Sequence, residues 1–319
     1  MTHLFSLENR ALVRVEGPGA PDFLNRLLTL DCKRLAVGQP SRAFLLEARG
    51  RVVLALRVLR LEATAFELEA ADAEPVLERL DHFHFGENLR FSAARDRVHL
   101  LLAGSEVDAS ELAVAKQSER GKTAEAAERR GNPADSLPFS AAEAILAAAG
   151  IETGAFCTDQ DVAVLPTDRL EGARELWVRA DARAAVEAAL VAAGAQPAGL
   201  EVLESLRVFQ GIAGDGEYGP EATPLEVGLA GITEGKGCYP GQEVIERTLA
   251  LGRPARTLIR VALSGELPVG SELMCEGDTA GRLTSVALGP DGMWVGLALV
   301  RPKLAAGPFE AGGVAVSAR

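Results

Sequence analysis

The sequence predicts an α+β protein with a duplicated body of antiparallel sheets and a small C-terminal β-barrel. Three observations predict it. The first 100 residues show the order strand, helix, strand, strand, helix, and a similar order recurs up to residue 194. Beyond Pro254 the pattern changes to short strand-like runs punctuated by Gly and Pro. With 319 residues, the chain is long enough for two or three domains. We expect the two halves of the body at 1–100 and 101–250, and the barrel at 251–319.

The first unit is predicted from alternation and helical spacing. Residues 11–16 alternate between apolar and polar types, as a half-buried strand does, and 17–19 are Gly-Pro-Gly. A stripe of Phe and Leu at helical spacing then predicts a helix around residues 23–28. Two β-like runs with a short gap, at 51–61 and 65–70, precede a helix from 73 to about 83.

The second unit repeats this order around a long insertion. A strand at 98–103 is followed, after the insertion 104–154, by a hairpin of strands near 161–166 and 175–178. Asp181 is the expected N-cap of the next helix, which Gly194 ends. Dense charge with Gly and Pro at 118–138 predicts a mobile loop inside the insertion.

The last fifth of the chain is predicted to form a barrel. Five short runs with frequent turns predict a small β-barrel of about 60 residues, with its boundary near residue 250. The runs are 257–263, 270–275, 281–288, 293–300 and 313–318.

Charge and cysteine content exclude several classes of protein. The net charge is 33 − 45 = −12, which argues against a general nucleic-acid binder that depends on many phosphate contacts. The four cysteines show no C-x-x-C spacing, so neither a zinc site nor a redox dithiol is expected. The first ten residues lack the apolar core of a secretion signal, and no apolar run approaches the roughly 20 residues that cross a bilayer. We therefore expect a cytoplasmic protein without membrane contact.

Two weaker patterns are set aside. His82 and His84 could hold a metal ion, but no carboxylate or Cys at ligand spacing completes the set, so no metal site is expected. No Gly-x-Ser-x-Gly elbow is present, and nothing else in the sequence supports a hydrolase.

The segment 235–243, Gly-Lys-Gly-Cys-Tyr-Pro-Gly-Gln-Glu, carries the most chemistry, and we call it the signature loop. Pro240 and Gly241 fit the central positions of a type II turn, since Pro fixes φ near −65° and Gly accepts a positive φ. Cys238 would therefore precede a tight reversal with its sulfur approachable. A nearby ammonium group, that of Lys236, favours the thiolate.

The groups that follow the turn suit a ligand with polar edges. Gln242 can donate and accept hydrogen bonds and Glu243 can accept them, as a heteroaromatic ligand requires. Residues 236–260 contain five cations and two anions, a net +3 that would concentrate an anionic ligand. The other interpretation is a plain linker whose cysteine is an inert small hydrophobe.

The signature loop, followed by Arg247 and Gly252, resembles the signature of the YgfZ-type folate-binding proteins. These are relatives of the T-protein, the aminomethyltransferase of the glycine cleavage system. The resemblance extends to Phe23-Leu24 with Leu28-Thr29 and Asp31, and to Leu206-Arg207 with Gly211-Ile212. It departs at Glu234-Gly235, where the family usually has an aromatic residue before the Lys-Gly-Cys string.

This resemblance implies a folate-binding body and a barrel around a channel that holds tetrahydrofolate or a one-carbon derivative. It implies support for iron–sulfur cluster assembly or repair in transient client proteins and an effect on tRNA modification. That effect is expected to be indirect, without nucleic-acid contact, because the chain shows no RNA-binding motif and no bulk positive charge. Cys238 would be the reactive thiol. The residues expected to contact the folate are Lys236, Gly237, Tyr239, Gly241, Gln242, Glu243, Arg247 and Arg207.

Two alternatives remain open. One is a true aminomethyltransferase, whose family carries a catalytic Asp after a Gly-rich strand. The corresponding stretch here, 50–55, is Gly-Arg-Val-Val-Leu-Ala, and both acidic positions are apolar. The other is a degenerate relative that binds no folate.

Overall fold

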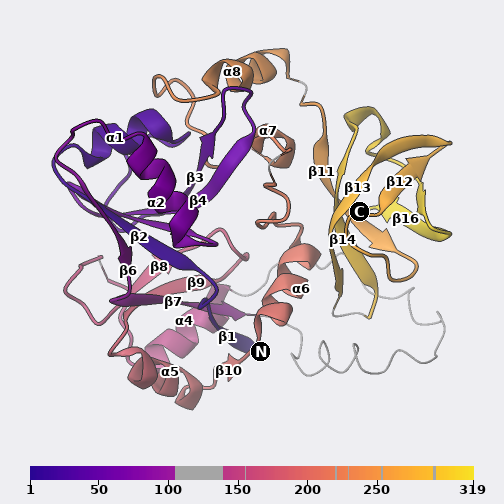
Figure 1. Cartoon of the computed structure of the whole chain (residues 1–319). Helices are drawn as coiled ribbons and strands as arrows, with labels where there is room; N and C mark the ends of the chain where they lie inside the picture. The colour runs from indigo at the N-terminus through magenta and orange to yellow at the C-terminus, as the bar shows by residue number, and fades with distance from the viewer. Residues whose placement is uncertain (105–138, 155, 220, 229, 253, 290–291) are drawn as a thin grey trace.

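A computed structural model describes residues 1–104, 139–154, 156–219, 221–228, 230–252, 254–289 and 292–319. Within these ranges the chain forms two five-stranded sheets and a closed barrel (Figure 1). The predicted α+β class is confirmed. The loop expected at 118–138 lies outside the described residues.

The first sheet is wholly antiparallel, in the order β3-β4-β5-β2-β6. Its Val13, Val15, Phe66 and Leu68 pack with α1 (Ala20–Leu27) and α2 (Ala73–His82) into one core. The strands at 11–16, 52–62 and 65–70 and both helices match the predicted first unit, whereas the strands at 40–46 and 90–94 were not predicted. The strands are β2 (Ala11–Glu16), β3 (Pro40–Leu46), β4 (Val52–Glu62), β5 (Ala65–Ala70) and β6 (Arg90–Ala94).

The second sheet has the order β10-β1-β7-β9-β8 and packs on α4 (Phe139–Ala148) and α5 (Arg183–Ala192). The sequence predicted a wholly antiparallel sheet, but β10 pairs with β1 in parallel. The N-terminal strand β1 joins this sheet, not the first one. The strands are β1 (Thr2–Ser6), β7 (Arg97–Gly104), β8 (Val162–Pro166), β9 (Arg174–Arg179) and β10 (Gln196–Pro197).

One predicted helix cap is wrong. The N-cap of α5 is Ala182, with no side-chain cap, and not Asp181. The Asp181 carboxylate instead accepts hydrogen bonds from Arg179 at the end of β9. An available guanidinium on the neighbouring strand therefore competes with the helix amides for this carboxylate.

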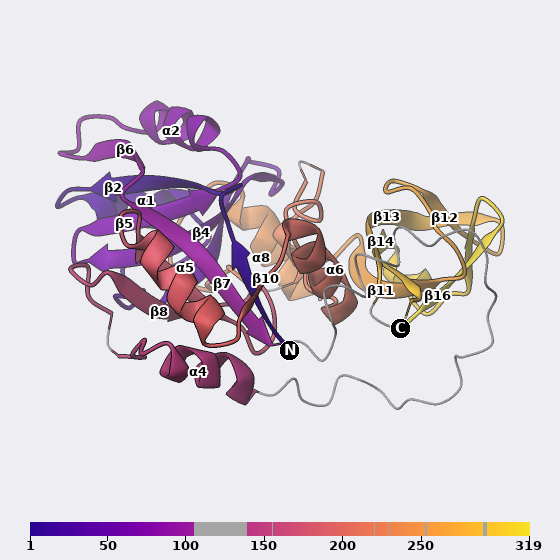
Figure 2. The same ribbon diagram turned by 90° about the horizontal axis from the view of Figure 1, so that it is seen from below.

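The two sheets face each other, and each carries its helices on its outer side. Figure 2 shows α2 and α4 on opposite sides of the stacked strands. Alternate residues of the inner strands point into the space between the sheets, where Glu67 and Glu69 of β5 meet His99 of β7 and Glu175 of β9. A buried polar layer therefore lies at the centre of the body.

The C-terminal barrel is closed, in the order β11-β14-β13-β12-β15-β16, and closure leaves no free strand edge. The prediction of a barrel is confirmed, with six strands and not five. The additional strand is three residues long, and its Phe309 is buried in the barrel core. The strands are β11 (Thr257–Leu263), β12 (Glu272–Cys275), β13 (Asp278–Leu288), β14 (Trp294–Val300), β15 (Phe309–Ala311) and β16 (Val314–Ala318), with a 3-10 turn at Pro302–Leu304.

Three helices connect the body to the barrel. They are α6 (Leu200–Gln210), which packs on β13 and β14, α7 (Pro224–Val227), which packs on β11, and α8 (Gln242–Leu251) (Figure 1). None of the helices in the described ranges is long and apolar enough to cross a membrane.

Candidate functional site at the signature loop

The predicted type II turn is present at Tyr239–Gln242. The Gln242 amide donates to the Tyr239 carbonyl over 3.2 Å, and Gly241 has φ +79° and ψ 0°. Gly241 is also the N-cap of α8. The turn therefore ends the loop and starts the helix at the same residue.

The turn packs on the tip of the β3–β4 hairpin, which Figure 1 shows beneath α8. A Cβ atom at Gly241 would lie 2.5 Å from the Glu47 carbonyl oxygen and 3.0 Å from the Gly50 Cα. Gly50 itself approaches Val244 of α8 just as closely. Both positions require glycine, and the close contact fixes the start of α8 against the first sheet.

The other side of the loop is joined to the segment that follows α1. The Thr233 amide donates to the Thr29 carbonyl over 2.9 Å, and the Asp31 amide donates to the Thr233 hydroxyl over 3.1 Å. The Lys236 ammonium donates to the Asn25 carbonyl oxygen. Residues 231–242 are thus held from both ends by the first unit of the body.

Lys236 has defined partners. Asn25 lies in the last turn of α1, where helix carbonyls lack intrahelical donors, so the ammonium caps that helix. The same ammonium lies 4.6 Å from the centre of the Tyr239 ring. Burial lowers the pKa of Lys236, although Cys32 and Asp31 act in the opposite direction.

The cysteines differ in accessibility. Cys238 and Cys157 are exposed, whereas Cys32 and Cys275 are buried. Burial raises the pKa of the Cys32 thiol to about 12. Cys238 therefore has the accessible sulfur that the sequence predicted.

A pocket of about 350 Å³ lies between the loop and α8, lined by Tyr239 but not by the preceding Cys238; we call it the signature pocket. The Tyr239 ring forms one wall, and burial with the nearby Glu246 raises the pKa of this phenol to about 12. The Gln242 amide donates to the Glu246 carboxylate over 2.5 Å. The lining residues are Ile232, Thr233, Glu234, Gly235, Tyr239, Glu246, Leu249 and Ala250.

The basic segment expected to attract an anion does not present its charges here. Lys236 faces Asn25, Arg256 pairs with Glu226 over 3.0 Å, and Arg260 donates to the Phe209 carbonyl over 2.6 Å. The charged residues that line the pocket are Glu234 and Glu246. Arg247 is exposed on α8 outside this lining, and Arg253 lies outside the described residues, so the expected attraction of an anion to segment 236–260 stays a prediction.

The remaining predicted contact residues of the loop and α8 lie near the signature pocket in sequence but do not line it. Glu243 and Arg247 are exposed on α8, Gln242 is half-buried, and Gly237 is exposed with φ +106°. They share the loop and the first turns of α8 with Cys238. Except for Arg207, the predicted residues thus lie in one region.

Arg207 is engaged elsewhere. Its guanidinium donates to the Glu217 carboxylate over 2.9 Å, to the Ile212 carbonyl over 2.6 Å and to the Ser285 hydroxyl over 2.8 Å. Ser285 belongs to β13, so Arg207 joins α6 to the barrel. None of its described hydrogen bonds reaches the signature loop.

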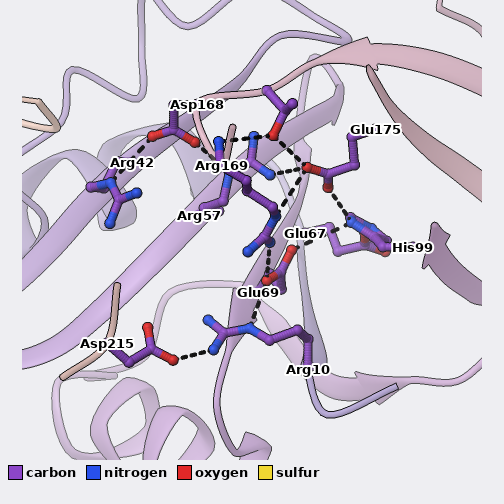
Figure 3. A network of polar contacts seen from close by, with 11 residues as sticks. Arg10, Arg42, Arg57, Glu67, Glu69, His99, Asp168, Arg169, Glu175 and Asp215 are labelled. Carbon is purple, nitrogen blue, oxygen red and sulfur yellow. Dashed lines mark hydrogen bonds and ion pairs between the residues drawn. The ribbon is translucent and has the colours of Figure 1, made fainter. Parts of the chain in front are cut away.

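Sequence reasoning missed a second polar group, the layer between the sheets shown in Figure 3. His99 Nδ1 lies 2.5 Å from a Glu175 oxygen, and His99 Nε2 lies 3.1 Å from a Glu67 oxygen. Because carboxylates only accept, both ring nitrogens carry protons. Burial by itself lowers the pKa of His99, but the hydrogen bonds from its ring to Glu175, Glu67 and Glu69 outweigh it and hold that pKa well above its usual value.

Arginines neutralise the remaining charge of this layer. Burial alone raises the pKa of Glu175, but Arg57 and Arg169 hold it well below its ordinary value, and Arg169 does the same for Glu69. Glu69, His99 and Glu175 lie close enough together to hold a metal ion. Their oxygens are already shared with these cations, which argues for an ion-pair layer. A pocket of about 360 Å³ opens beside His99, at the edge of the layer.

Comparisons with known proteins agree with this geometry. No family model matches the chain. Proteins named tRNA-modifying protein YgfZ match over most of it. The one from Klebsiella pneumoniae is 27% identical over 261 residues, which cover 80% of this chain and 70% of that protein. The one from Shigella boydii is 26% identical over 277 residues, which cover 84% of this chain and 74% of that protein. A chloroplastic Arabidopsis thaliana protein, named as a transferase, is 38% identical over 105 residues, 32% of this chain and only 24% of that protein.

A solved structure shares the fold. The glycine cleavage aminomethyltransferase T of Bartonella henselae superposes with a TM-score of 0.78 at 22% identity, covering 100% of this chain and 85% of that chain. The T-protein-like fold, with its closed C-terminal barrel, is confirmed.

Proposed function

We propose that this chain, a member of the YgfZ-type family with the fold of the glycine cleavage aminomethyltransferases, binds tetrahydrofolate or a one-carbon derivative and supports iron–sulfur cluster assembly or repair. Its effect on tRNA modification would be indirect, through iron–sulfur client proteins met transiently. The proposed compartment is the cytoplasm, in keeping with four cysteines that are all free.

One observation carries the proposal: Cys238 is exposed, directly precedes Tyr239 of the signature pocket in the chain, and precedes a turn that is fixed on both sides. A thiolate is a nucleophile and a ligand for iron, and it needs access to act as either. Four scattered cysteines of which two are buried do not suit a resident cluster. A helper that meets clusters on other proteins fits this arrangement better.

The proposed folate contacts are the remaining residues of the signature loop and its helix. The Tyr239 ring supplies a stacking surface, and Gln242 and Glu243 supply the donor and acceptors for a heteroaromatic edge. The full proposed set is Lys236, Gly237, Tyr239, Gly241, Gln242, Glu243, Arg247 and Arg207. Within this set, Lys236 and Arg207 also have the structural partners described above.

The alternative is an aminomethyltransferase, favoured by the fold. That reaction would require a carboxylate to act on the transferring carbon. Val52–Ala55 on β4 offers none, and the described carboxylates between the sheets, Glu67, Glu69 and Glu175, are ion-paired. Robust glycine-cleavage exchange activity of the purified protein would favour this alternative.

The proposal is tested by separating ligand binding from thiol function. Anaerobic calorimetric titration with tetrahydrofolate should give saturable heat below about 1 mM ligand. In a strain that lacks the gene, Cys238→Ala at normal protein levels should fail to restore the activity of iron–sulfur enzymes. Cys157→Ala, which removes the other exposed thiol, should restore it fully. Full rescue by Cys238→Ala would overturn the proposed role of the thiol. No heat with tetrahydrofolate would overturn the proposed folate binding.

A further inference from the structure

We infer that the signature pocket receives a basic side chain, Lys or Arg, of a partner protein, and that this contact brings the partner close to Cys238. The inference rests on the proposed function in one respect, namely that a partner protein must reach this thiol. It concerns the acidic side of the pocket, whose lining shares only Tyr239 with the proposed folate contacts.

The charge of the pocket carries the first step. Glu234 and Glu246 both line it and both are exposed. In the described part of the chain, Glu234 has no hydrogen bond or ion pair, and Glu246 accepts only from the neutral amide of Gln242. No Lys or Arg lines the pocket. Two uncompensated carboxylates around one hollow attract a cation and repel an anion.

Tyr239 provides the second step. Its ring lines the pocket and already has one ammonium, that of Lys236, 4.6 Å from its centre. Lys236 does not line the pocket, so it leaves the hollow free for another cation. The Tyr239 hydroxyl has no hydrogen-bond partner among the described residues, and it remains protonated at neutral pH. The pocket thus combines carboxylates, a phenol and an aromatic wall, groups that recognise ammonium and guanidinium ions.

The volume of the signature pocket and the residues around it favour a protein side chain as its occupant. About 350 Å³ accommodates one long side chain, whose methylene stem would pack on Ile232 and Leu249. Leu251, just beyond the pocket on α8, is 66% exposed and offers an apolar contact outside it. A basic side chain next to an apolar residue is therefore the matching partner surface. Because Cys238 directly precedes Tyr239 in the chain, a partner anchored here is brought within one residue of the exposed thiol.

The local potential can be read from the thiol itself. We would measure the modification of Cys238 in a Cys157→Ser background with two methanethiosulfonates, one carrying trimethylammonium and one carrying sulfonate. The thiolate attacks the reagent sulfur and releases methanesulfinate, which leaves a mixed disulfide. We take the ratio of the two rate constants, cationic over anionic reagent, and divide it by the same ratio for a small free thiol. At low salt we expect the result to be about ten. Glu234→Gln with Glu246→Gln should abolish the preference.

A matched control tests whether the effect is local. Glu266 and Glu272 are exposed in the barrel region. The double variant Glu266→Gln with Glu272→Gln removes the same net charge, so it should leave the reagent preference unchanged. A preference for the anionic reagent would show that Lys236 dominates the potential and would overturn the inference.

Occupancy is tested directly with argininamide. In amide NMR spectra, argininamide should shift the signals of residues 232–235, 239 and 249–250, while its neutral isostere citrullinamide should not. The shifts should disappear in the Glu234→Gln, Glu246→Gln variant. Absence of these shifts in the unmodified protein would overturn the inference.

Tetrahydrofolate distinguishes this inference from the proposed function. If it shifts the same signals and its affinity falls at least tenfold in the double variant, the pocket belongs to the folate and the inference is wrong. If folate binds normally and argininamide does not, the inference alone fails. If argininamide binds and folate does not, the folate part of the proposed function fails alone.

Discussion

Arg57 of β4 and Glu175 of β9 form an ion pair that joins the two sheets, although their side chains are only 8% and 1% exposed. Glu175 also accepts from Thr167 over 3.1 Å and lies 2.5 Å from His99. The desolvation of these charges is offset because each has several partners. The centre of the body is therefore stabilised by a network and not by apolar packing alone.

Removing one carboxylate from this network should be costly. Glu175→Gln keeps the shape but leaves Arg57, Arg169 and His99 with one anion fewer. We expect the free energy of unfolding to fall by about 3–5 kcal/mol, the typical cost of an uncompensated buried charge. Urea titration followed by circular dichroism measures it.

The control is a more exposed pair, which joins the same strand, β9, to helix α4. Arg174 and Glu143 lie 2.7 Å apart, and the Glu143 side chain is 47% exposed. Glu143→Gln should change the free energy of unfolding by less than about 1 kcal/mol. Equal effects of the two substitutions would contradict the network interpretation.

His99 should make stability depend on pH. Its pKa is raised in the folded protein, so its stabilising contribution is complete below the unfolded value near 6.5 and is lost as the pH rises toward the folded value. Between pH 6.5 and 8, the free energy of unfolding should fall by up to about 1.4 kcal/mol per pH unit. Thermal or urea unfolding at several pH values measures this slope.

The His99→Gln variant tests whether His99 causes this pH dependence of the free energy of unfolding. This variant should be less stable at pH 6.5 and should lose most of the dependence between pH 6.5 and 8. Measurements should stop at pH 8, because the raised pKa of Cys32 adds a slope of the same sign where thiols of the unfolded chain ionise. A variant that retains the full slope would assign it to other groups.

Thiol labelling should follow burial. Iodoacetamide should modify two thiols per folded chain, Cys157 and Cys238, and spare Cys32 and Cys275. The high pKa of Cys32, about 12, slows its reaction further. Intact-mass spectrometry counts the adducts, and urea-unfolded protein should take up four. Rapid modification of Cys32 in the folded protein would contradict the described packing.

Gly241 should tolerate substitution less well than another glycine of the same loop. Gly235→Ala meets open space at φ +69°, so it should cost only the backbone strain of about 1 kcal/mol. Gly241→Ala adds a contact of 2.5 Å with the Glu47 carbonyl, and we expect a loss on the order of 2–3 kcal/mol. Melting temperatures of both variants test the order, and equal shifts would argue against the close packing on the hairpin.

Local chemistry accounts for what could be predicted. Pro240-Gly241 defines its turn without help from the rest of the chain, and the alternation of Ala11–Glu16 defines its strand. The same alternation misleads in β5, where Glu67 and Glu69 indicate a solvated face. That face is instead covered by the second sheet, whose strands come from both ends of the body.

The polar partners of the site residues could not be predicted from the sequence, because they become neighbours only in the folded chain. Lys236 meets Asn25 across 211 positions of sequence, and Arg256 meets Glu226 across 30. No spacing rule reports such pairs. The exposed thiol could be predicted from its small neighbours, whereas the acidic character of the signature pocket could not.

The hydrogen bonds of Arg207 indicate a structural role, although the sequence predicted it as a ligand contact. It donates to Ser285 over 2.8 Å, and Ser285 donates to the buried carboxylate of Glu217 over 2.6 Å. This closed set joins α6 to β13, where a shift in strand register directs Ser285 toward the body. The geometry predicts that Arg207 stabilises the junction between body and barrel.

A double-mutant cycle with Arg207→Met and Ser285→Ala tests this role. Each substitution should lower the free energy of unfolding, and Arg207→Met should lower it more because it leaves Glu217 buried without its cation, a loss of about 3–5 kcal/mol. The two effects should be non-additive by at least about 0.5 kcal/mol, since the residues share one network. Tetrahydrofolate titration of Ser285→Ala and of Arg207→Met supplies the second measurement. If Arg207→Met weakens folate binding with unchanged stability, Arg207 acts on the ligand, and the structural assignment is wrong.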